Sequence, residues 1–305
     1  MEEKRKVVGA YAGLVLMTTI IGFSFIFIKV ALQSAGPVDI LAHRFSVAAL
    51  SLLLYYGIVR RRLPRYDKGV IGQLLVLSLF YPILMFSLQT IGLQFTTASE
   101  AGIMSATAPI VTVIFAALML KERNTLWQNL SVVLSVAGVM YIMYKNGLDG
   151  MSAETLKGDM IVLLSVVSMA FYFVLARRMT RKVDALDITF FMTLMAAVVF
   201  NIISMGLHVK EGSMGSYFVA FEDSSFMWSI LYLGVLSSFL TSFLTNNALT
   251  VIPAGQVSIF NNFSPVIAVL GGVLFLNESL FGYHIVGGVM VLLGIVGVNV
   301  LKKKE

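Results

Sequence analysis

Two charged side chains stand in long apolar runs of this sequence, and both could recognise a charged ligand. Arg44 lies inside the run "DILAHRFSVAALSLLL", and Glu100 opens the run "EAGIMSATAPIVTVIFAALML". A guanidinium group donates paired hydrogen bonds to a carboxylate, whereas a carboxylate accepts hydrogen bonds from an amine or carries a proton. If the fold brings them together, this base and this acid are complementary to a zwitterion.

The depth of each side chain in its apolar run decides how costly its charge is. Fifteen residues, 45–59, follow Arg44 before the next basic segment, which places it about 22 Å from that end at 1.5 Å per residue. Arg44 should therefore face the protein interior or a hydrated cavity, because exposure to lipid at that depth is unfavourable. It could form a buried salt bridge with Glu100 or Asp39, or bind an anion. Glu100 and Lys29 lie near the ends of their runs, where Lys29 can reach the interface.

Three prolines are expected close to the midpoints of apolar spans and should act as hinges or kinks: Pro82, Pro109 and Pro265. A proline inside a helix removes the hydrogen bond to the carbonyl four residues earlier. The freed carbonyls belong to Ser78, Ser105 and Asn261. In lipid such a carbonyl needs a partner from protein or water. The prolines therefore predict either a central hydrated cavity or kinks that serve packing alone.

Other polar side chains fall at about the same depth. Four of them, Ser238, Thr241, Ser242 and Thr245, follow the spacing of one helix face. Such a face lines a cavity or joins neighbouring helices by hydrogen bonds. The candidate substrate-binding residues are Arg44, Tyr81, Glu100, Ser105, Thr241, Thr245, Asn261 and Asn262.

Motifs for catalysis or metal binding are absent from the sequence. It contains no cysteine, no GxxxxGK[ST], no GxSxG and no HExxH, and its three histidines have no ligand-like spacing. The expectation is therefore a chain that is not an enzyme and needs neither a cofactor nor a metal. Its bases are explained by membrane topology, so no nucleic-acid partner is expected.

The elements that must position these side chains are apolar helices. The 305 residues are 58% hydrophobic and 12% charged, with a mean hydropathy of +0.89, against about 25% charged residues in soluble domains. Reading for runs of about 20 residues predicts ten membrane spans. They cover residues 8–32, 38–59, 69–93, 97–120, 126–144, 158–178, 187–208, 226–250, 254–276 and 282–301. The predicted fold class is an all-α membrane protein in a lipid bilayer.

The distribution of bases predicts the orientation of the chain. With the N-terminus in the cytoplasm, the cytoplasmic segments hold 17 Lys and Arg and the outer loops hold 3. Because positive residues collect on the cytoplasmic side, both termini are expected there, in the plasma membrane of a bacterium-like cell. A monomer and a homodimer are both compatible with the sequence.

An internal repeat divides the chain into residues 1–147 and 148–305. Residues 98–140 align without a gap on 254–296, with nine of 43 positions identical, and Pro109 falls on Pro265. Five spans in each half is an odd number, so the second half should be inverted relative to the first. Inverted repeats are typical of transporters that work by alternating access.

The same segments carry a family resemblance. The run quoted around Arg44, "FTTASEAGIMSATAPIVTVIFAALMLKERNTLWQNLSVVLSVAGVMYIM" and "IPAGQVSIFNNFSPVIAVLGGVLFLNESLFGYHIVGGVMVLLGIVGVNVL" resemble the two halves of an EamA-type transporter of the drug/metabolite transporter superfamily. The resemblance covers nearly the whole chain. It implies a ten-helix fold and transport, and it leaves the substrate open.

The function expected from the sequence is secondary transport of a small polar metabolite. An amino acid or related compound, exported by alternating access, is the first choice, with Arg44 holding its carboxylate and Glu100 balancing Arg44 or binding the amine. The alternatives are nucleotide-linked sugars, sugar phosphates or nucleobases in the same fold. A gated channel is a further alternative from another class.

Overall fold

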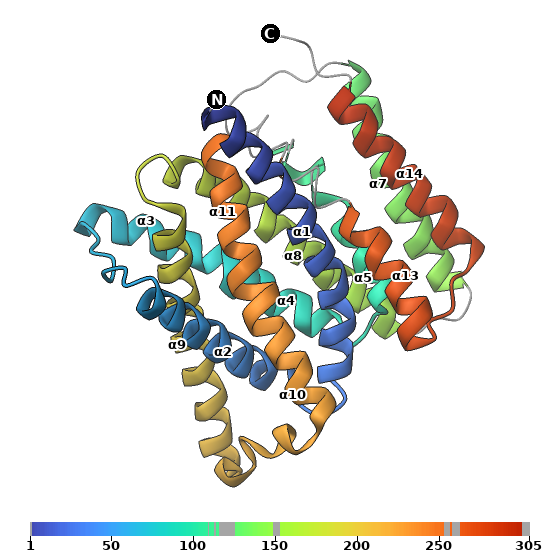
Figure 1. The fold of residues 1–305 in the computed structure, drawn as a ribbon. Coiled ribbons are helices and arrows are strands. Elements are labelled where there is room, and N and C mark those ends of the chain that lie inside the picture. Colours follow the sequence, from blue (N-terminus) through green and yellow to red (C-terminus); the bar gives the residue numbers. More distant parts are fainter. Residues whose placement is uncertain are drawn as a thin grey trace.

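The computed structural model describes residues 2–108, 110–112, 114–115, 126–148, 153–252, 257 and 263–300. Within these residues all regular structure is helical (Figure 1). The first half contains α1 (Glu2–Ala31), α2 (Pro37–Ile58), α3 (Lys68–Ser78), the π-helical segment η1 (Leu79–Leu84), α4 (Met85–Gly92), α5 (Ala98–Ser105) and α7 (Leu126–Leu148). The second contains α8 (Ala153–Met179), α9 (Ala185–Glu211), the short turns η2 (Met214–Ser216) and η3 (Val219–Glu222), α10 (Ser224–Leu231), the π-helical segment η4 (Tyr232–Leu240), α11 (Thr241–Val251), α13 (Ser264–Leu276) and α14 (Gly282–Val300).

Six helical stretches are long and apolar enough to cross a membrane, namely Val7–Ala31, Pro37–Ile58, Lys68–Gly92, Ala153–Met179, Ala185–Glu211 and Ser224–Val251. Shorter apolar helices cover Asn129–Lys145, Ser264–Leu276 and Gly282–Gly294. The fourth predicted span is described chiefly by α5 and its first following turn. The count of ten therefore stays a prediction, while an all-helical, multiply spanning architecture is clear.

Apolar side chains cover the outside of the molecule as well as its core. Ile58 is 81% exposed, Leu274 71% and Ile202 67%. A soluble protein of this size does not expose so many large apolar groups over its surface. These side chains are in place to contact lipid.

The helix ends follow from local sequence. Pro37 opens α2, where its missing N–H is no loss. Asp184 caps α9 by accepting a hydrogen bond from the backbone N–H of Leu186, and Gly212 ends that helix with a left-handed φ of 68°. Thr97 and Glu100 form a capping box at the start of α5.

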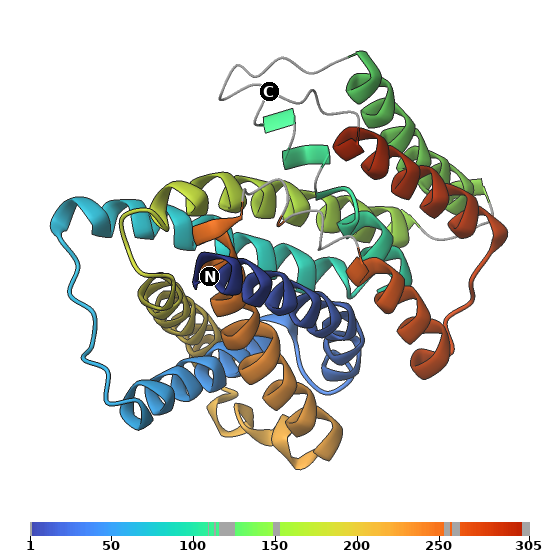
Figure 2. The same cartoon turned by 45° about the horizontal axis from the view of Figure 1, so that its top comes forward.

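The main helix pairs each join the first half of the chain to the second. α7 packs along α14, α2 along α9, α4 along α8, and α13 lies against both α1 and α5. Figures 1 and 2 show the α7–α14 pair at one edge, beside the larger group of helices. The start of α1 and the end of α14 lie at the same end of the molecule in Figure 1.

Glycines allow the close approach of α7 and α14. A Cβ on Gly138 would lie 2.7 Å from the carbonyl oxygen of Gly287, and one on Gly287 would lie 2.8 Å from the carbonyl oxygen of Gly138. On Gly294 it would lie 2.6 Å from the carbonyl oxygen of Ser131. The two backbones can touch only because these residues have no side chain.

Candidate functional site

A cavity of about 40 Å³ lies among helices from both halves of the chain. Its wall combines aromatic rings and methionines with hydroxyl and amide groups. The lining residues are Ile21, Ser24, Phe25, Tyr81, Met85, Phe86, Gln89, Ser105, Met169, Tyr172, Phe173, Ser237, Thr241, Thr245 and Ser264. A buried water needs roughly 10–15 Å³ of such volume, so the space holds only a few waters and is too small for a metabolite in this conformation.

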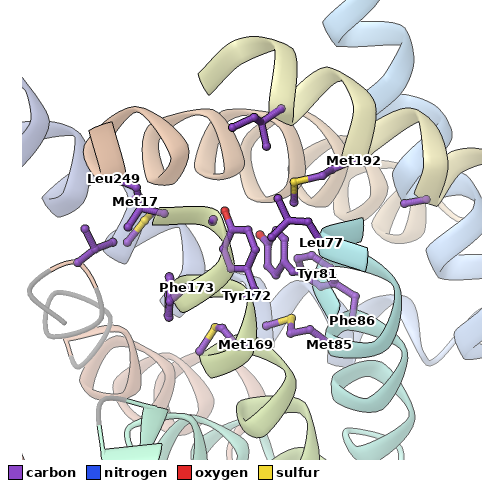
Figure 3. Packing of buried hydrophobic residues seen from close by; sticks show 14 of the residues in the cluster. Met17, Leu77, Tyr81, Met85, Phe86, Met169, Tyr172, Phe173, Met192 and Leu249 are labelled. Carbon is purple, nitrogen blue, oxygen red and sulfur yellow. The ribbon is translucent and has the colours of Figure 1, made fainter. Parts of the chain in front are cut away.

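The break in the third span places Tyr81 in this wall. Between α3 and α4 the backbone of Tyr81 leaves the helical region, with φ −144° and ψ 120°, immediately before Pro82. The ring of Tyr81 stacks on that of Tyr172 from α8, with centroids 4.3 Å apart. Figure 3 shows these two rings side by side, with Phe86 and Met85 close by. Tyr81 and its neighbours thus form an aromatic wall.

The π-helical segment η4 places two serines against Arg44. The Arg44 Nε donates a hydrogen bond to the Ser238 Oγ over 2.6 Å, and its Nη2 donates to the Ser237 Oγ over 3.0 Å. Gly234 permits the contact between η4 and α2, because a Cβ there would lie 2.8 Å from the Arg44 carbonyl oxygen. Since Ser237 also lines the cavity, Arg44 lies directly behind the cavity wall.

Arg44 is fully buried, with none of its surface exposed. Its guanidinium carbon lies 4.0 Å from the centre of the Phe86 ring, in cation–π contact. Among the described residues no carboxylate forms an ion pair with it, and its Nη1 has no hydrogen-bond partner. A buried cation held only by neutral groups retains a large part of its desolvation cost.

Thr241 and Thr245 line the cavity, and both hydroxyl groups already donate their protons to backbone carbonyls. Thr241 Oγ1 donates to the carbonyl of Ser237, and Thr245 Oγ1 donates to that of Thr241 over 2.7 Å. Their remaining lone pairs can accept hydrogen bonds from a ligand. Ser105 lies in the same wall, so three of the predicted hydroxyls are brought together.

Glu100 is not placed where the zwitterion hypothesis needs it. It is fully buried at the start of α5, where its Oε2 accepts hydrogen bonds from Thr96 Oγ1 and from the backbone N–H of Thr97. Its Oε1 lies 3.2 Å from His284 Nε2. The expected pairing of Glu100 with Arg44 is therefore wrong, because the capping box and His284 hold the carboxylate elsewhere.

The cluster around Glu100 joins helix ends on one side of the molecule. Glu278, after α13, accepts hydrogen bonds from the backbone N–H groups of Ala98 and Ser99 over 2.7 and 2.9 Å. Lys29 of α1 donates to the carbonyls of Leu93 and Thr96 over 3.0 and 2.8 Å. This network, which we call the end clasp, ties α1, α5 and the α13–α14 connection together.

Asp39 does not pair with Arg44 either. Its Oδ1 lies 3.2 Å from the His208 Nε2 and accepts a hydrogen bond from Ser204. Both partners belong to α9. The alternative salt bridge of Arg44 is thus also wrong.

The predicted prolines fall in different settings. Pro82 interrupts the third span, as described above. Pro265 lies in the first turn of α13, at the start of that helix and not in its middle, where a proline costs no hydrogen bond. Pro109, Asn261 and Asn262 lie outside the described residues.

Several residues of this site were not predicted from the sequence. Tyr172, Phe86 and Ser237 have no charge and no diagnostic spacing, and the widened helix of η4 contains no proline. The only available signal was Gly234, three residues before the two consecutive serines Ser237 and Ser238. The sequence positions of His284 and Glu278 also gave no indication that these residues lie near Glu100 at the start of α5.

Comparison with known proteins decides the family. A family model described as the EamA-like transporter family matches residues 9–144 and 156–300. The chain belongs to the EamA-like transporter family. As a member of this family it is a multi-pass membrane transporter.

Relatives of this EamA-like transporter share most of its length. The uncharacterized transporter YcxC of Bacillus subtilis (strain 168) is 45% identical over 298 residues, which cover 97% of this chain and 94% of YcxC. The WAT1-related protein At3g28070 of Arabidopsis thaliana is 23% identical over 99% of this chain and 90% of its own. A solved crystal structure, 18% identical, superimposes with a TM-score of 0.60 over 93% of this chain and 99% of its own. That likeness shows the fold alone.

Proposed function

We propose that this EamA-like transporter moves a small organic anion across the membrane by alternating access, with Arg44 recognising the anionic group. The observation that carries the proposal is the fully buried guanidinium of Arg44, which lies behind the central cavity without an acidic partner among the described residues. Its free Nη1 is a donor in need of an acceptor. An incoming carboxylate supplies that acceptor and the missing negative charge.

The composition of the cavity wall favours a substrate with an apolar body. Aromatic and methionine side chains are seven of the fifteen lining residues, and the described lining residues include no acidic side chain. The amine of a zwitterion would therefore have no carboxylate partner there. An amino acid stays the second candidate, because aromatic ring faces such as that of Phe173 can also hold an ammonium group.

Alternating access is supported by the small size of the cavity and by the packing of the two halves. A space of about 40 Å³ must enlarge before a metabolite enters. The helix pairs α7–α14, α2–α9 and α4–α8 each place one element from residues 1–147 against one from 148–305. This arrangement suits two inverted repeats that rock against each other around a central site. Export, the direction expected from the sequence, is part of the proposal.

Transport into proteoliposomes tests the role of Arg44. The substrate panel pairs carboxylates with and without an amine, and adds neutral amides of the same shape. Arg44→Gln should weaken apparent affinity for the carboxylate by roughly 30-fold or more, because a lost buried charge contact costs about 2 kcal/mol or more. Arg44→Lys keeps the charge and should retain part of the affinity.

Arg62→Gln is the matched control, because Arg62 is an exposed arginine in the connection after α2. It should transport as the wild type does. Normal carboxylate transport by a monodisperse Arg44→Gln variant would refute the role of Arg44. Preference for amino acids over plain carboxylates would select the second candidate.

A further inference from the structure

A second hollow, of about 550 Å³, lies apart from the central cavity at one end of the helices. Its walls are the end of α2, the turn between α8 and α9, and the end of α11. We call it the basic groove, and its chemically informative residues are Tyr55, Arg61, Arg181, Lys182, Asp184 and Phe243. Its volume lies within the range of about 300–1,000 Å³ that is usual for small-molecule sites.

The basic groove lies at a membrane boundary. The candidate spans that form it end at Ile58, Met179 and Val251 and begin at Ala185. The groove therefore occupies the level at which these helices leave the apolar part of the bilayer. Lipid headgroups lie at this level.

The charges in the groove are unbalanced. Arg61 already has partners, since its Nη2 lies 2.9 Å from the Asp187 Oδ1 and 3.4 Å from the Asp184 Oδ1. Lys182 donates over 3.4 Å to the neutral Gln73. Among the described residues no carboxylate forms an ion pair with Arg181 or Lys182. Two exposed cations thus face the groove without a counter-ion.

The other wall of the groove carries Tyr55 and Phe243 beside the polar side chains of Asn247 and Thr250, and its aromatic part continues toward lipid. Tyr55 lies on the same helix face as Ile58, which is 81% exposed. On η4, Phe239 carries this aromatic wall further, with its ring centre 5.9 Å from that of Tyr55. A ligand that fits both walls has an anionic head and apolar chains.

We propose that the basic groove binds an anionic phospholipid from the adjacent leaflet. Its phosphate lies against Arg181 and Lys182, and its acyl chains follow Tyr55 and Phe243 into the bilayer. The two free bases supply the attraction to negative headgroups, and the aromatic side chains sit where such residues usually meet the interface. The lipid site is independent of Arg44 and of the transported substrate.

Lipid binding to the purified full-length protein tests this proposal. Native mass spectrometry in detergent compares phosphatidylglycerol with phosphatidylcholine of the same acyl chains. Phosphatidylglycerol should bind at least about tenfold more tightly to one site. The double variant Arg181→Ala/Lys182→Ala should reduce its affinity to that of phosphatidylcholine.

The matched control is Arg62→Ala/Arg65→Ala, which removes two charges from the neighbouring connection without touching the groove. It should keep the preference for phosphatidylglycerol. If the double variant is unstable, the single variants Arg181→Gln and Lys182→Gln replace it. Each should show a severalfold loss of affinity for phosphatidylglycerol.

Three outcomes would overturn the proposal. They are equal binding of both lipids, unchanged binding by the Arg181 and Lys182 variants, and an equal loss in the Arg62/Arg65 control. Free glycerol phosphate should not displace the lipid at equal concentration, because it lacks acyl chains. Displacement by it would identify a site for soluble anions instead of a lipid site.

Discussion

Buried charged residues in this transporter are held in two different ways. Glu100 accepts hydrogen bonds from the start of its own helix and lies beside a histidine, so its negative charge is satisfied within the protein. Arg44 is held by two serine hydroxyls and one ring face, all of them neutral. This difference is the reason why we propose Arg44, and not Glu100, as the group that binds the substrate.

Ser238→Ala should destabilise the protein by about 1–3 kcal/mol, because the buried Nε of Arg44 then lacks its acceptor. The thermal unfolding midpoint of the purified protein measures this effect. Ser224→Ala, at an exposed position on α10, is the control and should leave the midpoint unchanged. Equal midpoints for the two variants would show that Ser238 does not hold Arg44.

A second prediction at the residue scale concerns the end clasp. Glu278→Ala removes the acceptor of two backbone N–H groups at the start of α5, so the α13–α14 connection should loosen from that helix. Hydrogen exchange at Ala98 and Ser99 should become faster by roughly tenfold, since loss of such a contact costs about 1 kcal/mol or more. Unchanged exchange at both amides would mean that Glu278 does not close this end.

Helix interruptions and close helix contacts shape the cavity at the level of elements. η1 turns Tyr81 into the wall, and η4 directs Ser237 and Ser238 toward Arg44. Only the first of these interruptions has a proline. At the edge of the molecule, glycines allow the backbones of α7 and α14 to pack closely.

Gly287→Ala should weaken the α7–α14 contact, because the new Cβ would lie 2.4 Å from the Ile142 Cγ1 and 2.8 Å from the Gly138 carbonyl oxygen. Overpacking of this kind costs about 1–3 kcal/mol, which a lower thermal midpoint would reveal. The next residue supplies the control, since a Cβ on Gly288 meets nothing within 4 Å. Because alanine favours a helix more than glycine does, Gly288→Ala should not lower the midpoint, and equal destabilisation by it would show that the α7–α14 contact is not responsible.

At the scale of the whole molecule, the distribution of basic residues predicts how the chain is oriented in the membrane. The connection after α2 carries Arg60, Arg61 and Arg62, whereas the connection between α9 and α10 carries no lysine or arginine. Asp187 and Asp184 raise the pKa of Arg61 against the opposing effect of its burial, so this connection stays positive at any physiological pH. Positive connections remain in the cytoplasm.

Single cysteines test that orientation cleanly, because the chain has no cysteine of its own. In intact cells a membrane-impermeant maleimide should label Ser216→Cys and should not label Arg62→Cys, both of which are exposed positions. Permeabilised cells should show labelling of both. The reverse pattern in intact cells would invert the proposed topology.

The hydropathy and the local residue pattern of the sequence were enough to predict the all-helical membrane fold, the interruption at Pro82 and the burial of Arg44. Each of these features depends on residues close together in the chain. The partners of Arg44 and Glu100 were not predictable in this way. Ser238 is 194 positions from Arg44, and His284 is 184 from Glu100. Such pairs are decided only when helices from both halves pack, because packing alone determines which buried polar groups meet.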